Sequence, residues 1–312
     1  MALATALLTR MRVLQAVAES TSGTPGSVAQ IANVFDSKID AQIQPVERDG
    51  QGSLAPLAPV PGAYWGKATF KSELVGSGTA ATDPTWATVL LTACGVPITS
   101  HVAKPLSGSG ATATLGLNIA GRQFQIFGAM GKFTLNAENG KPAIFDWEFD
   151  GVWTPPTGVT LPTGPTFTTI PPRVAACTFT IGGTAYQVPK VEFAVDNTLY
   201  MRETILADGA GNASGYAACC IVQRKVTIKV APEALALATK DWFAAHLAST
   251  GVAFSMLVGS AAGNEFTLAA PNLVLLNPPG EESRSGIYAD NLEFLACRNS
   301  STGDDEFSLT IG

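Results

Sequence analysis

Three carboxylates alternate with large aromatic residues in the stretch FDWEFDGVW, residues 145–153. A β-strand would place Asp146, Glu148 and Asp150 on one face, with about 7 Å between successive side chains, and the aromatic rings on the other. Carboxylates at this spacing suit three roles. They could be the acid and base of an inverting glycosidase, which lie about 6.5–9.5 Å apart, they could ligate calcium, or they could form a charged wall.

The neighbouring sequence favours the charged wall. No cluster of His, Arg, Asn or Tyr adjoins these acids to raise one carboxyl pKa, as a general acid requires. Calcium stays open as an alternative, because this strand and the loop GDDEF, residues 303–307, both offer hard oxygen ligands. The stretch KVEFAVD, residues 190–196, carries Glu192 and Asp196 in the same alternation. We therefore expect a charged surface with no catalytic residue, no cofactor and no metal.

Other residues that could take part in catalysis or ligand binding are isolated in the sequence. His101 and His246 lie far apart, and no nucleophile is paired with either. The glycine-rich stretches 76–83 and 108–116 lack both the third glycine of a dinucleotide fingerprint and the lysine of a P-loop, so they predict turns. The cysteines have no metal-ligand spacing, and we expect small, mostly buried, reduced thiols. They are Cys94, Cys177, Cys219, Cys220 and Cys297.

The composition points to a protein that meets other subunits. Of 312 residues, 46% are apolar and only 14% are charged, compared with about 25% charged in a typical soluble domain. The net charge of −6 and the scattered bases argue against a nucleic-acid-binding face. Residues 1–20 are amphipathic and do not resemble a signal peptide, and no apolar run is long enough to cross a membrane. We expect assembly in a cytoplasm.

Period-two hydrophobic patterns dominate and predict a mainly β (α+β) protein, a β-sandwich or partial barrel with one flanking helix in each half. The helices are expected at 83–94, with Asp83 as N-cap, and at 231–250. Six prolines within residues 152–174 predict an extended connector that divides the chain. The predicted domains are 1–155 and 173–312, separated by a linker at 156–172.

The two halves resemble each other when the chain is shifted by half its length, which indicates a duplication. At this offset of 156, Trp86 falls on Trp242 and residues 68–75 lie over 225–230. Further along, 131–137 resembles 264–270 and WEF at 147–149 resembles LEF at 292–294, at offsets that drift through loop insertions.

Four stretches together resemble one known family. They are residues 16–40, 62–96, 131–153 and 303–312. They are similar to major tail tube proteins of long-tailed bacteriophages with flexible, non-contractile tails (siphophages). The resemblance implies a structural virion protein without enzymatic activity, with a β-sandwich fold, whose subunits join strands into rings that stack into a tube for DNA passage.

A chain with two tandem tail-tube-like domains would form a trimeric, pseudo-hexameric ring. The resemblance implies self-association, a tail terminator, tape measure and distal tail or baseplate proteins as partners, and DNA passing without specific binding. It implies no membrane insertion. The candidate lumen-lining acids are Asp146, Glu148, Asp150, Glu192 and Asp196.

Two further segments are expected to order against an adjacent ring, because they have too little hydrophobic pattern to fold alone. They are an N-terminal arm at 1–30 and a long Pro-rich loop at 48–62. Three alternatives stay open. They are a ring-forming neck or baseplate adaptor that does not polymerise, a carbohydrate-binding or hydrolytic β-sandwich that uses the acidic strand, and a monomeric domain pair whose apparent repeat is accidental.

Overall fold

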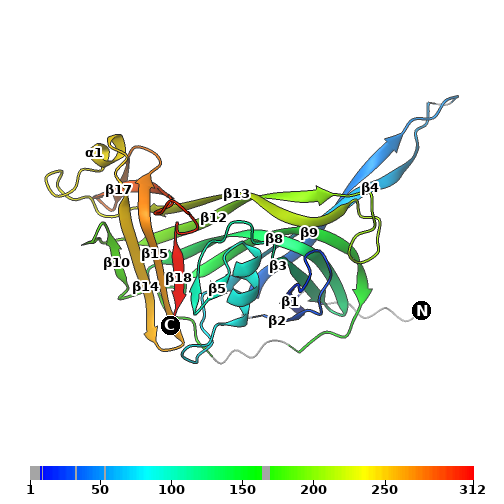
Figure 1. Cartoon of the computed structure of the whole chain (residues 1–312), viewed down its shortest axis with the longest axis horizontal. Coiled ribbons are helices and arrows are strands. Elements are labelled where there is room, and N and C mark those ends of the chain that lie inside the picture. The colour runs from blue at the N-terminus through cyan, green and yellow to red at the C-terminus, as the bar shows by residue number, and fades with distance from the viewer. Residues whose placement is uncertain (1–7, 9, 32–33, 53, 164–168) are drawn as a thin grey trace.

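The structure is a computed structural model that describes residues 8, 10–31, 34–52, 54–163 and 169–312. It is mainly β and antiparallel (Figure 1), so the predicted fold class is confirmed. The elements of the first half are β1 (Arg12–Ala18), β2 (Ala29–Gln30), β3 (Val34–Arg48), β4 (Leu57–Glu73), η1 (Ala87–Leu91), β5 (Ile98–Thr99), β6 (Val102–Ala103), β7 (Ala113–Ile119), β8 (Arg122–Glu138) and β9 (Ile144–Gly158).

The second half contains a similar series of elements. They are β10 (Thr178–Ile181), β11 (Thr184–Ala185), β12 (Lys190–Glu203), β13 (Tyr216–Val230), α1 (Trp242–Leu247), β14 (Val252–Ala261), β15 (Asn264–Leu275), β16 (Gly280–Arg284), β17 (Ile287–Ala296) and β18 (Ser308–Ile311).

Strand pairing repeats from one half to the other. The first half has the order β2-β1-β7-β8-β9-β4-β3. The second half has the order β11-β10-β14-β15-β17-β13-β12. Each half places its helix after the second strand of its long hairpin. The same order of pairing in both halves supports the duplication, which we retain as a proposal.

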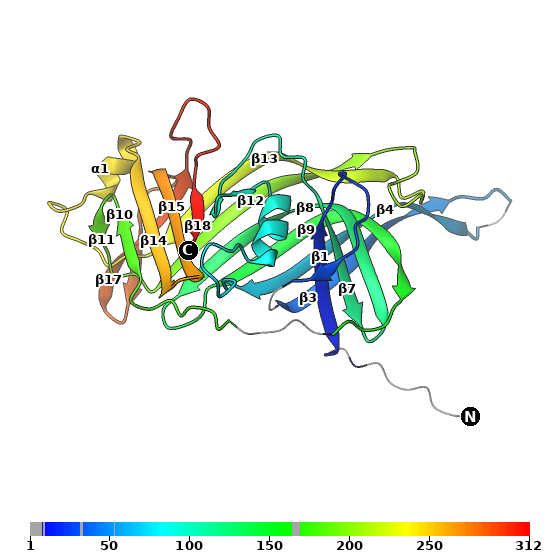
Figure 2. The same cartoon turned by 60° about the horizontal axis from the view of Figure 1, so that its bottom comes forward.

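The halves are joined edge to edge by strand pairing. Residues 133–138 of β8 pair with residues 190–195 of β12. An uninterrupted antiparallel sheet therefore runs β3-β4-β9-β8-β12-β13-β17-β15, with four strands from each half. The long β12–β13 hairpin extends from the second half across the first (Figures 1 and 2).

The apolar core follows from the alternation of residues along these strands. Phe145, Trp147 and Phe149 are at most 2% exposed and pack beneath the sheet. The core continues across the junction, where the rings of Phe133 and Phe193 have centroids 6.1 Å apart. Burial of large aromatic side chains is the main stabilising contribution here, because each removes about 150–250 Å² from water.

The first predicted helix is present but begins later than expected. Residues 85–93 are helical, and η1 is a π-helical segment within them. Trp86 is 1% exposed and its indole nitrogen donates to the Val75 carbonyl at 2.8 Å. The expected N-cap Asp83 instead contacts His101 Nδ1 at 2.9 Å. Gly95 ends the helix with a φ of 74°, as predicted for a left-handed C′ residue.

The second predicted helix, 231–250, is wrong in extent. Only Trp242–Leu247 is helical, and Asp241 caps it by accepting from the Ala244 amide at 2.9 Å. Residues 232–234 form backbone hydrogen bonds with residues 187, 288 and 290 instead. These long-range backbone bonds outweigh the alanine-rich helix propensity of the segment.

The predicted connector starts later than expected. Residues 152–158, which include Pro155 and Pro156, belong to β9 and pair with β8. The pairing of β9 with β4 ends at Gly151. The prolines therefore lie where one side of the strand needs no amide donor, and this makes them compatible with a strand. Within the remaining linker, residues 164–168 lie outside the described residues.

The predicted N-terminal arm and Pro-rich loop also have more structure than expected. Within 1–30, Arg12–Ala18 forms β1, which pairs with all of β7 and buries Leu14 and Ala16. Residues 1–7 and 9 lie outside the described residues. Within 48–62, β4 already begins at Leu57, so the segment is one end of a long β-hairpin that projects from the body (Figure 1). The sequence did not predict β1 because its partner β7 is distant in sequence, and it did not predict the start of β4 because that stretch is rich in proline.

One of the matches between the halves does not correspond in space. Residues 264–270 follow directly after the β14–β15 turn, whereas 131–137 lie in the second half of β8, beyond its pairing with β7. The match of WEF with LEF does correspond, because it places β9 and β17 in equivalent positions next to β4 and β13.

Candidate functional site

One face of the continuous sheet carries all five candidate acids. Asp146, Glu148 and Asp150 project from β9, and Glu192 and Asp196 project from β12, each between residues buried on the opposite face. β8 lies between β9 and β12 and pairs with both strands. The structure thus brings together acids from both halves of the chain.

Lysines from neighbouring strands lie between these acids. They come from β4, β8, β12 and β13, and they form a lattice of ion pairs across the strands. The pairs are Lys67–Glu148 (2.8 Å), Lys71–Asp146 (3.4 Å), Lys132–Glu148 (3.7 Å), Lys132–Asp196 (3.2 Å), Lys190–Glu192 (3.3 Å), Lys229–Glu192 (3.6 Å) and Lys229–Glu293 (3.8 Å). Instead of a purely acidic wall, the face is a mixed, nearly balanced array of charges.

Asp150 differs from the other acids on this face. Burial raises its pKa to about 6, and the Glu148 charge adds to this, whereas the charges of Lys67 and Lys132 lower it. Burial would lower the pKa of Lys132, but its hydrogen bond to Asp196 and the charges of Glu148, Asp196 and Asp150 raise it overall. The ion pairs therefore favour the charged form of Lys132, whereas burial favours the neutral form of Asp150.

The charged face is hollowed at its centre. A depression of about 590 Å³ is lined mainly by polar side chains of β3, β4, β8, β9, β12, β13 and β17. The aromatic residues of β9 point into the core on the other side of the sheet. A carbohydrate site stacks sugars on exposed aromatic rings, and β9 offers no such ring beside its acids.

Both histidines contact other groups of the protein. His246 Nδ1 contacts the Leu275 carbonyl at 3.3 Å, and His101 contacts Asp83. No group of three or more His, Cys, Asp or Glu that could hold a metal ion occurs among the residues that the structure describes. All five cysteines are free thiols, and burial raises the pKa of Cys94 well above its usual value.

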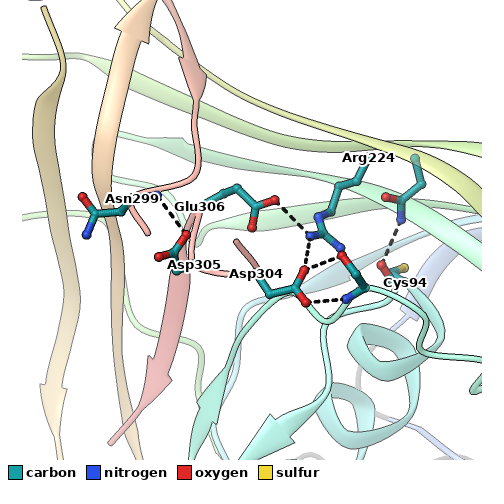
Figure 3. A network of polar contacts seen from close by, with 8 residues as sticks. Cys94, Arg224, Asn299, Asp304, Asp305 and Glu306 are labelled. Atoms are coloured by element: carbon teal, nitrogen blue, oxygen red, sulfur yellow. Dashed lines mark hydrogen bonds and ion pairs between the residues drawn. The ribbon is translucent and has the colours of Figure 1, made fainter. Parts of the chain in front are cut away.

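The loop at 303–307, weighed above as a calcium ligand, instead receives protein donors (Figure 3). Asp304 accepts from Arg224 at 2.9 Å and from the Ser107 hydroxyl at 2.6 Å. Arg224 also contacts Glu306 at 3.0 Å, and the Asn299 amide donates to Asp305 at 2.9 Å. The network fastens the loop before β18 to β13 and to the first half.

Sequence reasoning did not place the lysines of the charged face beside the acids. Lys67 and Lys71 alternate with Thr69 in KATFKSE, and Lys225 and Lys229 alternate in KVTIKV, so each strand has a basic polar face. This pattern was visible, but the register that sets lysine against acid was not.

No helix of the described chain is long and apolar enough to cross a membrane. The described residues form an open, mainly antiparallel β-sheet that carries a face of paired charges. The chain belongs to the phage tail tube protein family, whose model matches residues 9–296. The predicted membership of the tail tube proteins is therefore confirmed, and the chain is a structural component of a phage tail. The non-contractile tail and the two tandem domains stay predictions. No curated protein matches the sequence.

Proposed function

We propose that this chain forms the tube of a non-contractile phage tail, as stacked trimeric rings whose inner wall is the charged face. The observation that carries the proposal is the uninterrupted sheet with four strands from each half. Three chains would supply six halves and about 24 strands, which at ~4.8 Å spacing and ~40° tilt close into a barrel about 48 Å across at the backbone. Inward side chains leave a bore wide enough for duplex DNA.

The open edges of the sheet support ring closure. Among the described strands, β3 pairs with β4 alone, at one end of the sheet. At the other end, β16 follows β15 and pairs, among the described strands, with β17 alone. Gly131 of β8 and Leu275 of β15 pair with the corresponding residues Phe149 and Phe294, so residues 277–282 correspond to the part of β8 that pairs with β12. By this analogy, the outer edge of residues 277–282 would receive β3 of the next copy. Exposed strand edges invite such pairing.

The paired charges suit a conduit. Lysines bound to neighbouring carboxylates hold phosphates less strongly than free lysines, while the acids repel them. We propose Asp146, Glu148, Asp150, Glu192 and Asp196 as lining residues, together with the lysines between them. DNA would then pass without a specific contact. Assembly would take place in the host cytoplasm, with the terminator, tape measure and distal tail proteins at the ends of the tube.

Negative-stain electron microscopy at rising protein concentration tests the assembly. We expect hollow, stacked rings with threefold or pseudo-sixfold end views. Single rings that never stack would favour the neck or baseplate adaptor, and monomers at every concentration would contradict the proposal.

Thiol labelling tests which face lines the bore. Asp196→Cys should react with a small maleimide but not with a bulky polyethylene-glycol maleimide once tubes form. The control is Leu247→Cys on α1, whose Trp242 packs on the apolar side of the sheet against Phe294. The control should react with both reagents, and the unmodified chain gives the background of native thiols. Equal reaction of Asp196→Cys with both reagents would place the charged face outside.

A further inference from the structure

The two long hairpins, β3–β4 and β12–β13, are equivalent to the residue. Thr69 of β4 pairs with β9 at the position where Lys229 of β13 pairs with β17, so these two residues correspond. Their partners on the first strand of each hairpin, Lys38 and Glu192, therefore correspond as well. From there, Ile43–Tyr64 corresponds to Asn197–Arg224, and Pro45–Pro61 corresponds to Leu199–Ile221. Each hairpin has its first outward register shift between these two pairs. Both shifts place one extra residue on the second strand, so both hairpins bend at the same point.

Beyond this bend, the β12–β13 hairpin is covered by the first half of its own chain. The Tyr64 amide donates to the Ser214 carbonyl at 2.9 Å. Ala218 packs against Gly128 of β8, and Cys219 interacts with the Met130 backbone and with Asp150. Ala218 and Cys219 are 3% and 2% exposed. The surface on which this hairpin packs, called its seat below, is therefore formed by β4, β8 and β9.

No described part of the same chain covers the β3–β4 hairpin in this way. Its residues Ala58 and Pro59, which correspond to Ala218 and Cys219, are exposed. Val46, Leu57 and Val60 are 53%, 46% and 45% exposed. Prolines at 45, 59 and 61 remove amide donors from the hairpin, so it is suited to dock by its apolar face and not by adding a strand at its edge.

The second half contains the surface that corresponds to the seat. Arg224 corresponds to Tyr64, and Leu295 corresponds to Asp150, by the same register. Both residues line a groove of about 510 Å³ together with Gln223, Ala296 and Cys297. Within one copy, the β3–β4 hairpin projects from the end of the molecule opposite to β17, which carries Leu295 (Figure 1).

We propose that the β3–β4 hairpin of one copy lies in the groove at Leu295 and Ala296 of the neighbouring copy in the same ring. The inference rests on the ring proposed above and names the contact that locks adjacent copies together. The internal contact of β12–β13 on the first half is its template. Each half in the ring would then lay its hairpin across the preceding half, and the Leu54 tip would remain free to reach beyond the ring.

Disulfide trapping tests the contact. Pro59→Cys combined with Leu295→Cys, in a Cys297→Ser background, should give covalent dimers and trimers on non-reducing gels after mild oxidation of assembled protein. The single variants should not. Pro59→Cys combined with Leu247→Cys is the matched control for nonspecific oxidation. Asp150→Cys beside native Cys219 is the internal counterpart, and it should lose free thiols without forming covalent oligomers.

The outcomes separate this inference from the proposed function. Rings or tubes by electron microscopy with no covalent oligomers from the Pro59–Leu295 pair would overturn the hairpin contact and leave the tube intact. Absence of rings in the unmodified chain would overturn both. If the cysteine variants fail to assemble, Leu295→Lys provides a second test. It should raise the concentration needed for ring formation at least tenfold, whereas Leu247→Lys should not, and equal assembly of the two would overturn the contact.

Discussion

The β8–β12 junction and the outer edge of β3 hold the same place in the strand orders of the two halves, but among the described residues only the junction is paired. At the junction, six residues of β12 pair with β8, the aromatic cores meet, and the β12–β13 hairpin is covered. At β3, the equivalent strand and its hairpin face outward. The junction is therefore an internal example of the contact that we propose between copies.

Phe133→Ala should have the largest effect on the filled junction. Phe133 is 4% exposed and packs against Trp147 and Phe193. Loss of a buried aromatic ring and the cavity left behind should lower the free energy of unfolding by about 3–5 kcal/mol. Urea denaturation measures this. Phe243→Ala on the half-exposed face of α1 is the control, and an equal loss in both variants would show that the junction contributes nothing special.

Asn197→Ala should have the next largest effect. The Asn197 side chain is buried and donates to the Cys94 carbonyl at 2.9 Å and to the Gly131 carbonyl at 2.8 Å, so it ties the second half to the first. Removing it leaves two buried carbonyls without this donor, which should cost about 2 kcal/mol. Thermal unfolding of Asn197→Ala and of the exposed neighbour Thr198→Ala should differ clearly. Matching melting temperatures would argue against a tie.

Asp150→Asn should stabilise the protein at neutral pH. The folded pKa of Asp150 is raised to about 6, above an unfolded value of about 3.9. The folded protein therefore favours the neutral form of Asp150. The stability that this group contributes is fully present below pH ~4 and is lost as the pH rises through about 6 and the carboxyl ionises. The variant should gain about 1 kcal/mol at pH 7.5, after allowance for partial exposure, and nothing at pH 4. Asp146→Asn is the control, and a gain that does not depend on pH would contradict the assignment.

Lys132→Met should have the smallest effect. Its ion pair with Asp196 crosses the junction at 3.2 Å, but Asp196 is 61% exposed. Solvent and salt screen such a pair, so the loss should be below about 1 kcal/mol and should shrink further in high salt. Denaturation at low and high ionic strength measures it. A loss as large as that of Phe133→Ala would mean that charge, and not the apolar core, holds the junction.

Some of the site could be predicted from sequence because it depends on local alternation. Asp146, Glu148 and Asp150 share a face simply because a strand has a period of two, and Glu192 and Asp196 follow the same rule. The lysines opposite them could not be placed, because the pairing of β4 with β9 and of β12 with β13 is set by long-range register.

The sequence by itself determined the strand-rich class, the family and the acidic faces, since these follow from composition, alternation and motif. Only the tertiary structure decided that residues 12–18 join the sheet, that residues 231–241 are not helical, and that β12 extends the first half. The physical reason is that backbone hydrogen bonds and apolar burial between distant segments outweigh local propensity. Whether a strand edge is paired or exposed depends on which distant strand the fold places beside it.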